Sequence, residues 1–206
     1  MKVFKRIYYH GETVKPVLSI MIPALHQRKR MWNDLLAEIQ YQLIGMDKEG
    51  KYRQSVEVVM TLNDGEDATA GPKRNFLMDK AEGMYGWFID DDDMIAPGAL
   101  AAVLEALETK PDVIGLVGTI TATNGQSRRF EHFLEHKEYR TNGEVYERFP
   151  NHISPMKLEL MRQIRFEDKY PEDTPWAYWM RDAGLLKTQV KIEQPIYIYR
   201  SRMTNF

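Results

Sequence analysis

Four consecutive aspartates, Asp90 to Asp93, are the residues of this sequence best suited to carry chemistry. They directly follow the apolar segment Trp87-Phe88-Ile89. If the extended chain continues through them, Asp90 and Asp92 point to the same side. Paired carboxylates at the end of a buried strand suit Mg²⁺ or Mn²⁺, and a bound cation relieves their mutual repulsion. The alternative is a solvated acidic turn that caps the next helix.

A second candidate is the basic pair Lys73 and Arg74, which follows Gly71-Pro72. Pro is favoured at the first position of a helix, so the pair falls in a first helical turn. Cations there oppose the helix dipole, whereas a ligand phosphate is stabilised by both the dipole and the cations. The pair therefore indicates an anion site, with two solvated surface residues as the alternative.

A third candidate is Asp173, in Glu172-Asp173-Thr174-Pro175-Trp176. Asp173 could act as a general base beside a substrate pocket. Equally, Asp173 or Thr174 could cap a helix whose first residue is Pro175. The spacing alone does not favour the first interpretation.

Histidines and tryptophans give weaker signals. His152 precedes an expected helix, and by its position alone it could be an ordinary loop histidine. His132 and His136 lack the zincin pattern, and we interpret them as a surface pair. The helical spacing of Trp176 and Trp179 is more typical of a core than of a sugar-stacking floor.

The elements that must position these residues alternate in type. Short apolar runs predict buried strands at Val17–Ile22, Val56–Leu62, Tyr85–Ile89 and Val113–Ile120. Helical patterns separate them at Met31–Leu43, Gly71–Ala81 and Pro97–Leu107. This alternation is typical of an α/β unit with a mostly parallel sheet, in which ligands bind beyond the carboxyl ends of the strands.

The pattern weakens after Thr121. Residues Asn124–Tyr146 are polar and aromatic, which predicts a long surface excursion of the mobile, functional kind. Short helices at Lys157–Gln163 and Pro175–Ala183 and a last strand at Ile196–Arg200 should follow.

Composition excludes several classes of protein. The chain has 206 residues, which predicts one domain, and a net charge of -2, which excludes a strongly basic body held on nucleic acid by bulk charge. The absence of cysteine excludes a disulfide scaffold, a thiolate metal site and a cysteine nucleophile. We expect a cytoplasmic protein (host cytoplasm if viral), because the start lacks a secretory signal and no apolar run reaches the roughly 18 residues of a transmembrane segment. The phosphate loop, the dinucleotide fingerprint and the nucleophile elbow are also missing.

In their order along the chain, the motifs resemble the GT-A glycosyltransferases, in particular the inverting family 2 glycosyltransferases that use nucleotide-sugar donors. The resemblance extends over about Val17 to Arg200. The matching segments are Ile20-Met21-Ile22-Pro23, Asn63-Asp64-Gly65, Arg74-Asn75, Asp90 to Asp93 with Pro97, and Glu172-Asp173.

This resemblance implies a GT-A-like, three-layer α/β/α fold with a mostly parallel central sheet. It implies one domain, 1–206, with a nucleotide-sugar-binding half at about 1–120 and an acceptor half at about 121–206. The implied activity is metal-dependent, inverting transfer of a sugar to a hydroxyl acceptor, with Mn²⁺ or Mg²⁺ as cofactor. A UDP-sugar is the expected donor, with GDP- and dTDP-sugars as alternatives. A glycan or another hydroxyl compound is the expected acceptor, and a nucleic acid acceptor has little support in the charge.

The resemblance also implies roles for single residues. Pro23, Ala24 and Asp64 would line the nucleobase and ribose, and Asp173 would be the catalytic base. The remaining donor-binding residues would be Lys73, Arg74, Asp90 and Asp91. The metal ligands would be Asp92, Asp93 and His152, although the tetrad leaves open which of Asp91, Asp92 and Asp93 is the true ligand.

Two other functions compete with this one. A nucleotidyltransferase also presents carboxylates to a metal and a triphosphate, but Pro23 to Arg30 contains no glycine and so offers no glycine-rich activation loop. A non-catalytic carbohydrate- or metal-binding module on the same fold is the second alternative.

Overall fold

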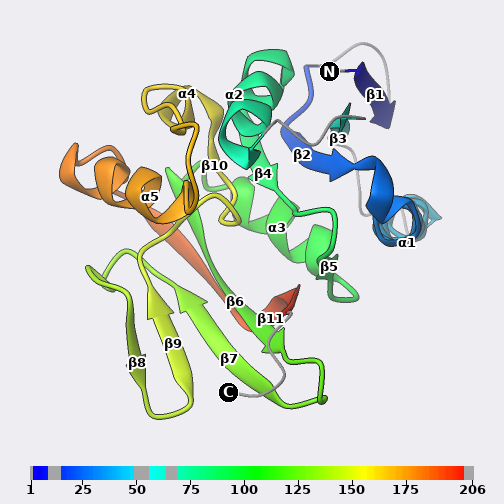
Figure 1. The fold of residues 1–206 in the computed structure, drawn as a ribbon. Helices are drawn as coiled ribbons and strands as arrows, with labels where there is room; N and C mark the ends of the chain where they lie inside the picture. The colour runs from blue at the N-terminus through cyan, green and yellow to red at the C-terminus, as the bar shows by residue number, and fades with distance from the viewer. Residues whose placement is uncertain (1, 9–14, 49–55, 64–68, 202–206) are drawn as a thin grey trace.

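The computed structural model describes residues 2–8, 15–48, 56–63 and 69–201 of the chain. Asp64, expected at the nucleobase, lies outside these residues. In the described part, the strands form one sheet whose central members are parallel (Figure 1). These parallel neighbours are β3 (Val56–Asn63), β2 (Leu18–Leu25) and β4 (Tyr85–Phe88).

The sheet continues on both sides of this centre. Next to β4 is the short β10 (Met156–Lys157), which runs antiparallel to β4 and to β6 (Val113–Thr121), so β6 keeps the direction of β4. The last strand, β11 (Gln189–Arg200), pairs parallel with β6 and antiparallel with β5 (Met94–Ile95). At the opposite edge, β1 (Lys2–Tyr8) pairs antiparallel with β3.

Helices cover both faces of the sheet. One face packs against α1 (Lys29–Lys48) and α3 (Ala99–Leu107), and the other packs against α2 (Ala70–Lys80), α4 (Leu158–Met161) and α5 (Asp173–Asp182). Side chains of β2 alternate between the two cores, with Ile20 and Ile22 in one and Met21 in the other. Helices cover both faces of the sheet, so both faces are buried. The sequences of the central strands are therefore continuous apolar runs. The predicted three-layer α/β/α fold is confirmed.

The expected excursion at Asn124–Tyr146 is wrong. This part of the chain forms β7 (Ser127–His132), β8 (Arg140–Asn142) and β9 (Val145–Arg148), which extend the sheet beyond β6 (Figure 1). These strands carry many polar side chains on partly exposed faces, so they lack the apolar alternation from which a strand is usually predicted.

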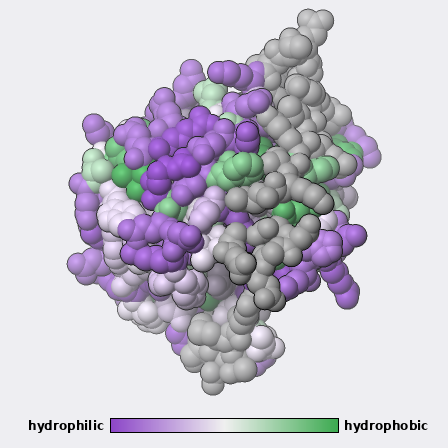
Figure 2. All heavy atoms as spheres, turned by 45° about the horizontal axis from the view of Figure 1, so that its top comes forward, coloured by the Kyte–Doolittle hydropathy of each residue, from purple (hydrophilic) through white to green (hydrophobic). Residues whose placement is uncertain are grey.

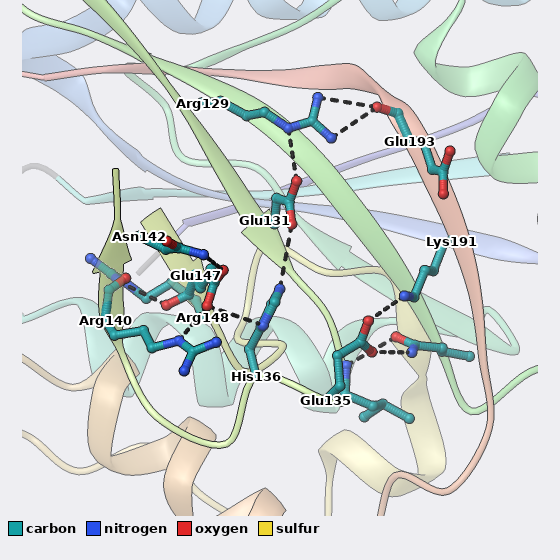
Figure 3. A network of polar contacts seen from close by, with 12 residues as sticks. Arg129, Glu131, Glu135, His136, Arg140, Asn142, Glu147, Arg148, Lys191 and Glu193 are labelled. Carbon is teal, nitrogen blue, oxygen red and sulfur yellow. Dashed lines mark hydrogen bonds and ion pairs between the residues drawn. The ribbon is translucent and has the colours of Figure 1, made fainter. Parts of the chain in front are cut away.

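Polar contacts hold this second part of the sheet together (Figure 3). His136 lies between two carboxylates, with Nε2 3.4 Å from Glu131 Oε2 and Nδ1 3.6 Å from Glu147 Oε2. Glu147 also accepts hydrogen bonds from Arg140 and Asn142 of the neighbouring strand. Cross-strand pairs of this kind specify the pairing where apolar periodicity does not.

Smaller differences concern the ends of elements. The edge strand β1 was not expected, β2 continues past Pro23 to Leu25, and β11 begins at Gln189 rather than near Ile196. Its pairing with β6 shifts register around Pro195, where the apolar pattern is interrupted.

The described part of the face in Figure 2 is largely hydrophilic, with separate smaller hydrophobic areas. Among the described residues, none of the helices is both long and apolar enough to cross a membrane.

Candidate active site

A cavity of about 1130 Å³ opens at the carboxyl ends of β2, β4 and β6. Parallel strands of an α/β sheet place ligand sites at this edge. The cavity brings together residues from both halves of the sequence. Its lining includes Pro23, Lys73, Arg74, Asp90, Asp91, Asp92, His152, Glu172 and Asp173. Most of the residues that were expected to form one site therefore share one cavity.

The aspartate tetrad forms a turn, not a continuation of β4. The backbone N–H of Asp93 donates to the carbonyl of Asp90 at 3.0 Å, so the alternation of an extended strand does not apply. Asp90 and Asp92 do line the same cavity, but not through strand alternation, because Asp91 lines it as well. Asp91 and Asp92 instead share one partner, because Arg28 Nη1 lies 2.5 Å from Asp91 Oδ1 and 2.9 Å from Asp92 Oδ2.

Asp91 and Asp92 differ in exposure. The Asp91 side chain is 2% exposed and also accepts a hydrogen bond from the Leu25 N–H at 2.6 Å, whereas the Asp92 side chain is 20% exposed. Burial raises the pKa of both carboxyl groups, and the charge of Arg28 opposes that rise. Of the two, Asp92 is the carboxylate that a ligand in the cavity can reach more easily.

Asp93 is turned away from the cavity. Its Oδ2 accepts from the Tyr197 hydroxyl at 2.8 Å and its Oδ1 from the Arg200 N–H at 2.9 Å. The residue is 1% exposed and does not line the cavity. Burial raises its pKa well above the usual value. These contacts tie the turn to β11, and the expected role of Asp93 as a metal ligand does not fit this placement.

Arg74 is the buried centre of the site. Its Nη1 lies 2.9 Å from Asp90 Oδ1 and its Nε 3.2 Å from Glu172 Oε1. The guanidinium carbon also lies 5.3 Å from the centre of the Phe88 ring, a cation–π contact. Burial alone would raise the pKa of Asp90, but the charges of Arg74 and His152 outweigh it and hold that pKa well below its usual range. Arg74 therefore joins the tetrad to the segment that precedes α5.

Lys73 is also buried, at 3% exposure, and it lines the cavity. Burial lowers its pKa, and the charge of Asp91 only partly offsets this. Within the part of the chain that the structure describes, Lys73 forms no ion pair. A buried ammonium group in this setting is stabilised by an anionic ligand.

His152 lies between the tetrad and Asp173. Its Nε2 is 3.5 Å from Asp90 Oδ2 and its Nδ1 is 3.9 Å from Asp173 Oδ2. The Asp173 side chain is 29% exposed and lies in the first turn of α5, where Glu172 is the N-cap residue. The site thus places the partly exposed carboxylate of Asp173 near a histidine that also contacts the tetrad.

Helix α2 fixes the position of the segment around Phe166 and Glu167, which precedes α5. Asn75 exchanges two hydrogen bonds with the backbone of Phe166, at 2.8 and 2.9 Å. The helix approaches so closely that a Cβ on Gly71 would lie 2.0 Å from the Glu167 carbonyl oxygen. Glycine is required here because no larger residue leaves room for that carbonyl.

The donor set fits a divalent cation in part. Asp92 offers hard oxygen atoms at the cavity wall, as Mg²⁺ and Mn²⁺ prefer. Among the described residues, however, no three His, Asp or Glu side chains are gathered as a ready-made metal site. Mg²⁺ is commonly held by one or two carboxylates together with substrate phosphates, and this arrangement is compatible with that mode.

Sequence reasoning missed one side of the cavity, formed by Tyr139, Tyr146 and Arg148. We call this set the tyrosine wall, and we call the opposite set (Arg28, Lys73, Arg74, Asp90, Asp91 and Asp92) the acidic wall. The tyrosine wall comes from the segment that was expected to be a surface excursion. The only local signal was the abundance of aromatic residues in that segment.

Other expectations have mixed outcomes. Ala24 is fully buried in the core and does not line the cavity, whereas Pro23 does. The interpretation of His132 as a surface residue is wrong, because it is 4% exposed and lines the cavity, and burial lowers its pKa to about 3. Trp176 is fully buried in the core, as its spacing predicted, whereas Trp179 is only partly buried and belongs to neither core.

Comparison with known proteins identifies the family. Residues 58–168, more than half of the chain, match the sequence model of glycosyl transferase family 2. The chain belongs to that family. The matched segment includes Lys73, Arg74, the tetrad and His152, and it ends before Asp173.

Individual relatives agree with this assignment. The "Minor teichoic acid biosynthesis protein GgaB" of Bacillus subtilis (strain 168) is 26% identical over 214 residues, a match covering 98% of this chain and 22% of that protein. The crystal structure of S. aureus TarS residues 1–349 with UDP-GlcNAc aligns with a TM-score of 0.60 at 16% identity, covering 90% of this chain and 58% of that one. The UDP complex of the same protein aligns with a TM-score of 0.61 at 16% identity, covering 89% of this chain and 60% of that one. The chain therefore spans about a fifth of the curated relative, and the TarS structures confirm the GT-A-like fold.

Proposed function

We propose that this family 2 glycosyltransferase transfers a sugar from a UDP-sugar to a hydroxyl acceptor, with inversion at the sugar carbon and with Mn²⁺ or Mg²⁺ held at Asp92. The observation that carries the proposal is the acidic wall, where the buried Lys73 and the partly exposed carboxylate of Asp92 line one cavity. A nucleoside diphosphate and its divalent cation need this combination, a protein cation for the phosphate oxygens and a carboxylate for the metal.

Donor binding is assigned to the acidic wall. Lys73 would bind the diphosphate, and Pro23 would lie against the nucleotide. Asp90 would accept from the ribose or from a metal-bound water, although its pairing with Arg74 already uses one of its oxygens. UDP as the nucleotide is supported by the TarS complexes with UDP-GlcNAc and UDP.

Asp92 is the proposed metal ligand, in preference to Asp93, because only Asp92 lines the cavity. A divalent cation there would neutralise the charge of the departing diphosphate. Arg28 lies 2.9 Å from Asp92, so its guanidinium and a cation would compete for the same carboxylate oxygen.

Asp173 is the proposed general base. In a single displacement, the acceptor oxygen forms a bond to the sugar carbon as the bond to the diphosphate oxygen breaks, and the hydroxyl proton passes to Asp173. His152, 3.9 Å from Asp173, would position this carboxylate rather than ligate the metal. Its contact with Asp90 links the base to the donor side.

The acceptor class is suggested by the curated relative, a teichoic acid biosynthesis protein. A cell-surface polymer of that class carries hydroxyl groups that could be glycosylated. The whole enzyme's acceptor is therefore proposed to be a polymer of this class.

The test is calorimetric titration with UDP, GDP and dTDP, each with Mn²⁺ and with chelator, combined with a UDP-release assay. We expect UDP to bind in a Mn²⁺-dependent manner, and Asp92→Asn to lose that dependence. Asp182→Asn is the matched control, because Asp182 is an exposed carboxylate at the end of α5.

Three results would contradict the proposal. Full activity of the Asp92→Asn variant in chelator would exclude the metal mechanism. Pyrophosphate release from a nucleoside triphosphate and a sugar phosphate would indicate a nucleotidyltransferase. Glycan binding without nucleotide binding would indicate a non-catalytic module.

A further inference from the structure

Arg148, at the end of β9, is held rigidly in the tyrosine wall. Its guanidinium carbon lies 4.8 Å from the centre of the Tyr139 ring and 5.2 Å from that of Tyr146. Its Nη1 donates to two backbone carbonyls, those of Arg140 at 2.8 Å and Glu147 at 2.9 Å. The side chain is therefore fixed by contacts that use only one of its nitrogen atoms.

The other two nitrogens, Nε and Nη2, lie along one edge of the planar guanidinium. In the described residues they have no hydrogen-bond partner, and Arg148 forms no ion pair with a carboxylate. That edge is the fork with which arginine binds two oxygens of a phosphate or a carboxylate. Burial lowers the pKa of Arg148, but a guanidinium remains charged at neutral pH.

Two other cavity arginines, Arg28 and Arg74, are paired with carboxylates. Arg28 pairs with Asp91 and Asp92, and Arg74 pairs with Asp90 and Glu172. A partly buried cation without a counter-ion is costly to desolvate unless a ligand supplies the negative charge. The cavity that Arg148 lines also contains Asp173, so a ligand bound to Arg148 lies in the same space as the proposed base.

Tyr139 connects the two residues. It stacks under Arg148, and its pKa is raised by burial and by the nearby charge of Asp173. Arg148 is thus close to the base without being its ion-pair partner. An oxyanion held there belongs to a part of the acceptor next to the attacking hydroxyl, not to the hydroxyl itself.

We propose that the acceptor is an anion, and that Arg148 binds a phosphate or carboxylate group of the acceptor beside the sugar-accepting hydroxyl. This inference rests on the proposed function, because it assumes that the cavity binds donor and acceptor together. It adds the charge of the acceptor and the residue that recognises it.

The test is calorimetric titration of the UDP- and Mn²⁺-loaded protein with three oligomers of matched length: a neutral polyol, a glycerol phosphodiester and a galacturonate. We expect the neutral oligomer to bind at least about tenfold more weakly than one of the anions. The anion that binds more tightly shows whether Arg148 recognises a phosphate or a carboxylate. Arg148→Gln should lower the affinity for that anion by about tenfold or more, because it removes a charge-assisted pair. The affinity for UDP should not change.

Two further variants make the result specific. Arg129→Gln is the matched control, because Arg129 lies on β7 but pairs with Glu131 (Figure 3), and it should bind the anion as the wild type does. Arg148→Lys keeps the charge but loses the fork, so it should bind the anion with intermediate affinity. The same variant tests the inference if Arg148→Gln does not fold.

The inference is overturned if the wild type binds the neutral oligomer as tightly as both anions or binds none of the three. It is also overturned if Arg148→Gln and Arg148→Lys both retain wild-type affinity for the anion, or if Arg148→Gln lowers the affinity for UDP instead. Failure of the proposed function is recognised separately, because the wild type would then bind no UDP at all.

Discussion

The two walls of the cavity handle charge in opposite ways. In the acidic wall, two arginines form ion pairs with three aspartates within the protein, and Arg74 does so at 4% exposure. In the tyrosine wall, Arg148 stacks on aromatic rings and has no carboxylate partner among the described residues. The difference suggests that the acidic wall is built by folding, whereas the tyrosine wall is completed by a ligand.

The two walls also come from parts of the chain that are stabilised differently. The acidic wall stands on β2, β4 and α2, whose apolar side chains fill both cores. The tyrosine wall stands on β8 and β9 and the chain around them, which the polar network of Glu131, His136 and Glu147 holds together. Substitutions should therefore separate catalysis, folding and ligand recognition along this division.

The largest effect is expected for Asp173→Asn. Loss of a general base typically lowers the rate by 10²–10⁴-fold, and we expect a fall of about 10³-fold in the rate of transfer. UDP affinity should not change, because the donor is assigned to the acidic wall. Initial rates and calorimetry on the same preparation check both statements. An equal loss of UDP binding would assign Asp173 to the structure of the site instead.

The next effect is on folding, from Arg74→Met. The change leaves the buried Glu172 and the partly buried Asp90 without their cation, and breaking a buried ion pair destabilises a protein by about 3–5 kcal/mol. Arg165→Met is the control, since Arg165 pairs with Asp79 at the surface, where a pair contributes about 1 kcal/mol or less. Urea denaturation measures both. Similar losses in the two variants would mean that the acidic wall does not depend on its internal charge balance.

The fold could be predicted from the sequence in the region that carries the acidic wall, but much less in the region that carries the tyrosine wall. The longer strands and helices from Val17 to Ile120 were predicted correctly in type and order, because each of these strands is buried on both faces and its sequence is an apolar run. The two-residue strand β5 in this range was not predicted. Local pattern fails at β7–β9, where the stabilising partners are distant in sequence: Glu135 contacts Gln189 and Lys191, and Arg129 contacts Glu193.

The candidate site was predicted in part for the same reason. Residue types identified Lys73, Arg74, the tetrad and Asp173, all from motifs whose members are close in sequence. The direction of each tetrad side chain depends on a turn closed by the Asp93 N–H and on Tyr197, a residue more than a hundred positions away. The tyrosine wall requires β7 and β9 to pair, which no short motif encodes.

A third prediction concerns His132, which lines the cavity. Its pKa of about 3 in the folded state is below the value of about 6.5 for an unfolded histidine, so the unfolded chain binds more protons between these pH values. The stabilisation by neutral His132 is complete above about pH 6.5 and is lost progressively as the pH falls towards 3. Lowering the pH to about 5 should destabilise the fold by up to about 2 kcal/mol through this group.

The variant His132→Asn checks this assignment. The free energy of unfolding should depend less steeply on pH between about 6.5 and 4 than in the wild type, whatever its absolute level. Denaturant titrations at several pH values give the two slopes. Parallel curves would mean that another group causes the acid sensitivity.

The smallest expected effect concerns Arg28 and tests whether the acidic wall must give up part of its internal pairing to function. Arg28 Nη1 occupies the space between Asp91 and Asp92, so a divalent cation at Asp92 must compete with it. Arg28→Ala should therefore strengthen Mn²⁺ binding by about fivefold, since a partly exposed pair contributes about 1 kcal/mol. Lys29→Ala, an exposed neighbouring cation, controls for the general change in charge. Electron paramagnetic resonance of Mn²⁺ measures the affinity without requiring turnover. Weaker Mn²⁺ binding in Arg28→Ala would reverse the conclusion, because Arg28 would then orient Asp92 for the metal instead of competing with it.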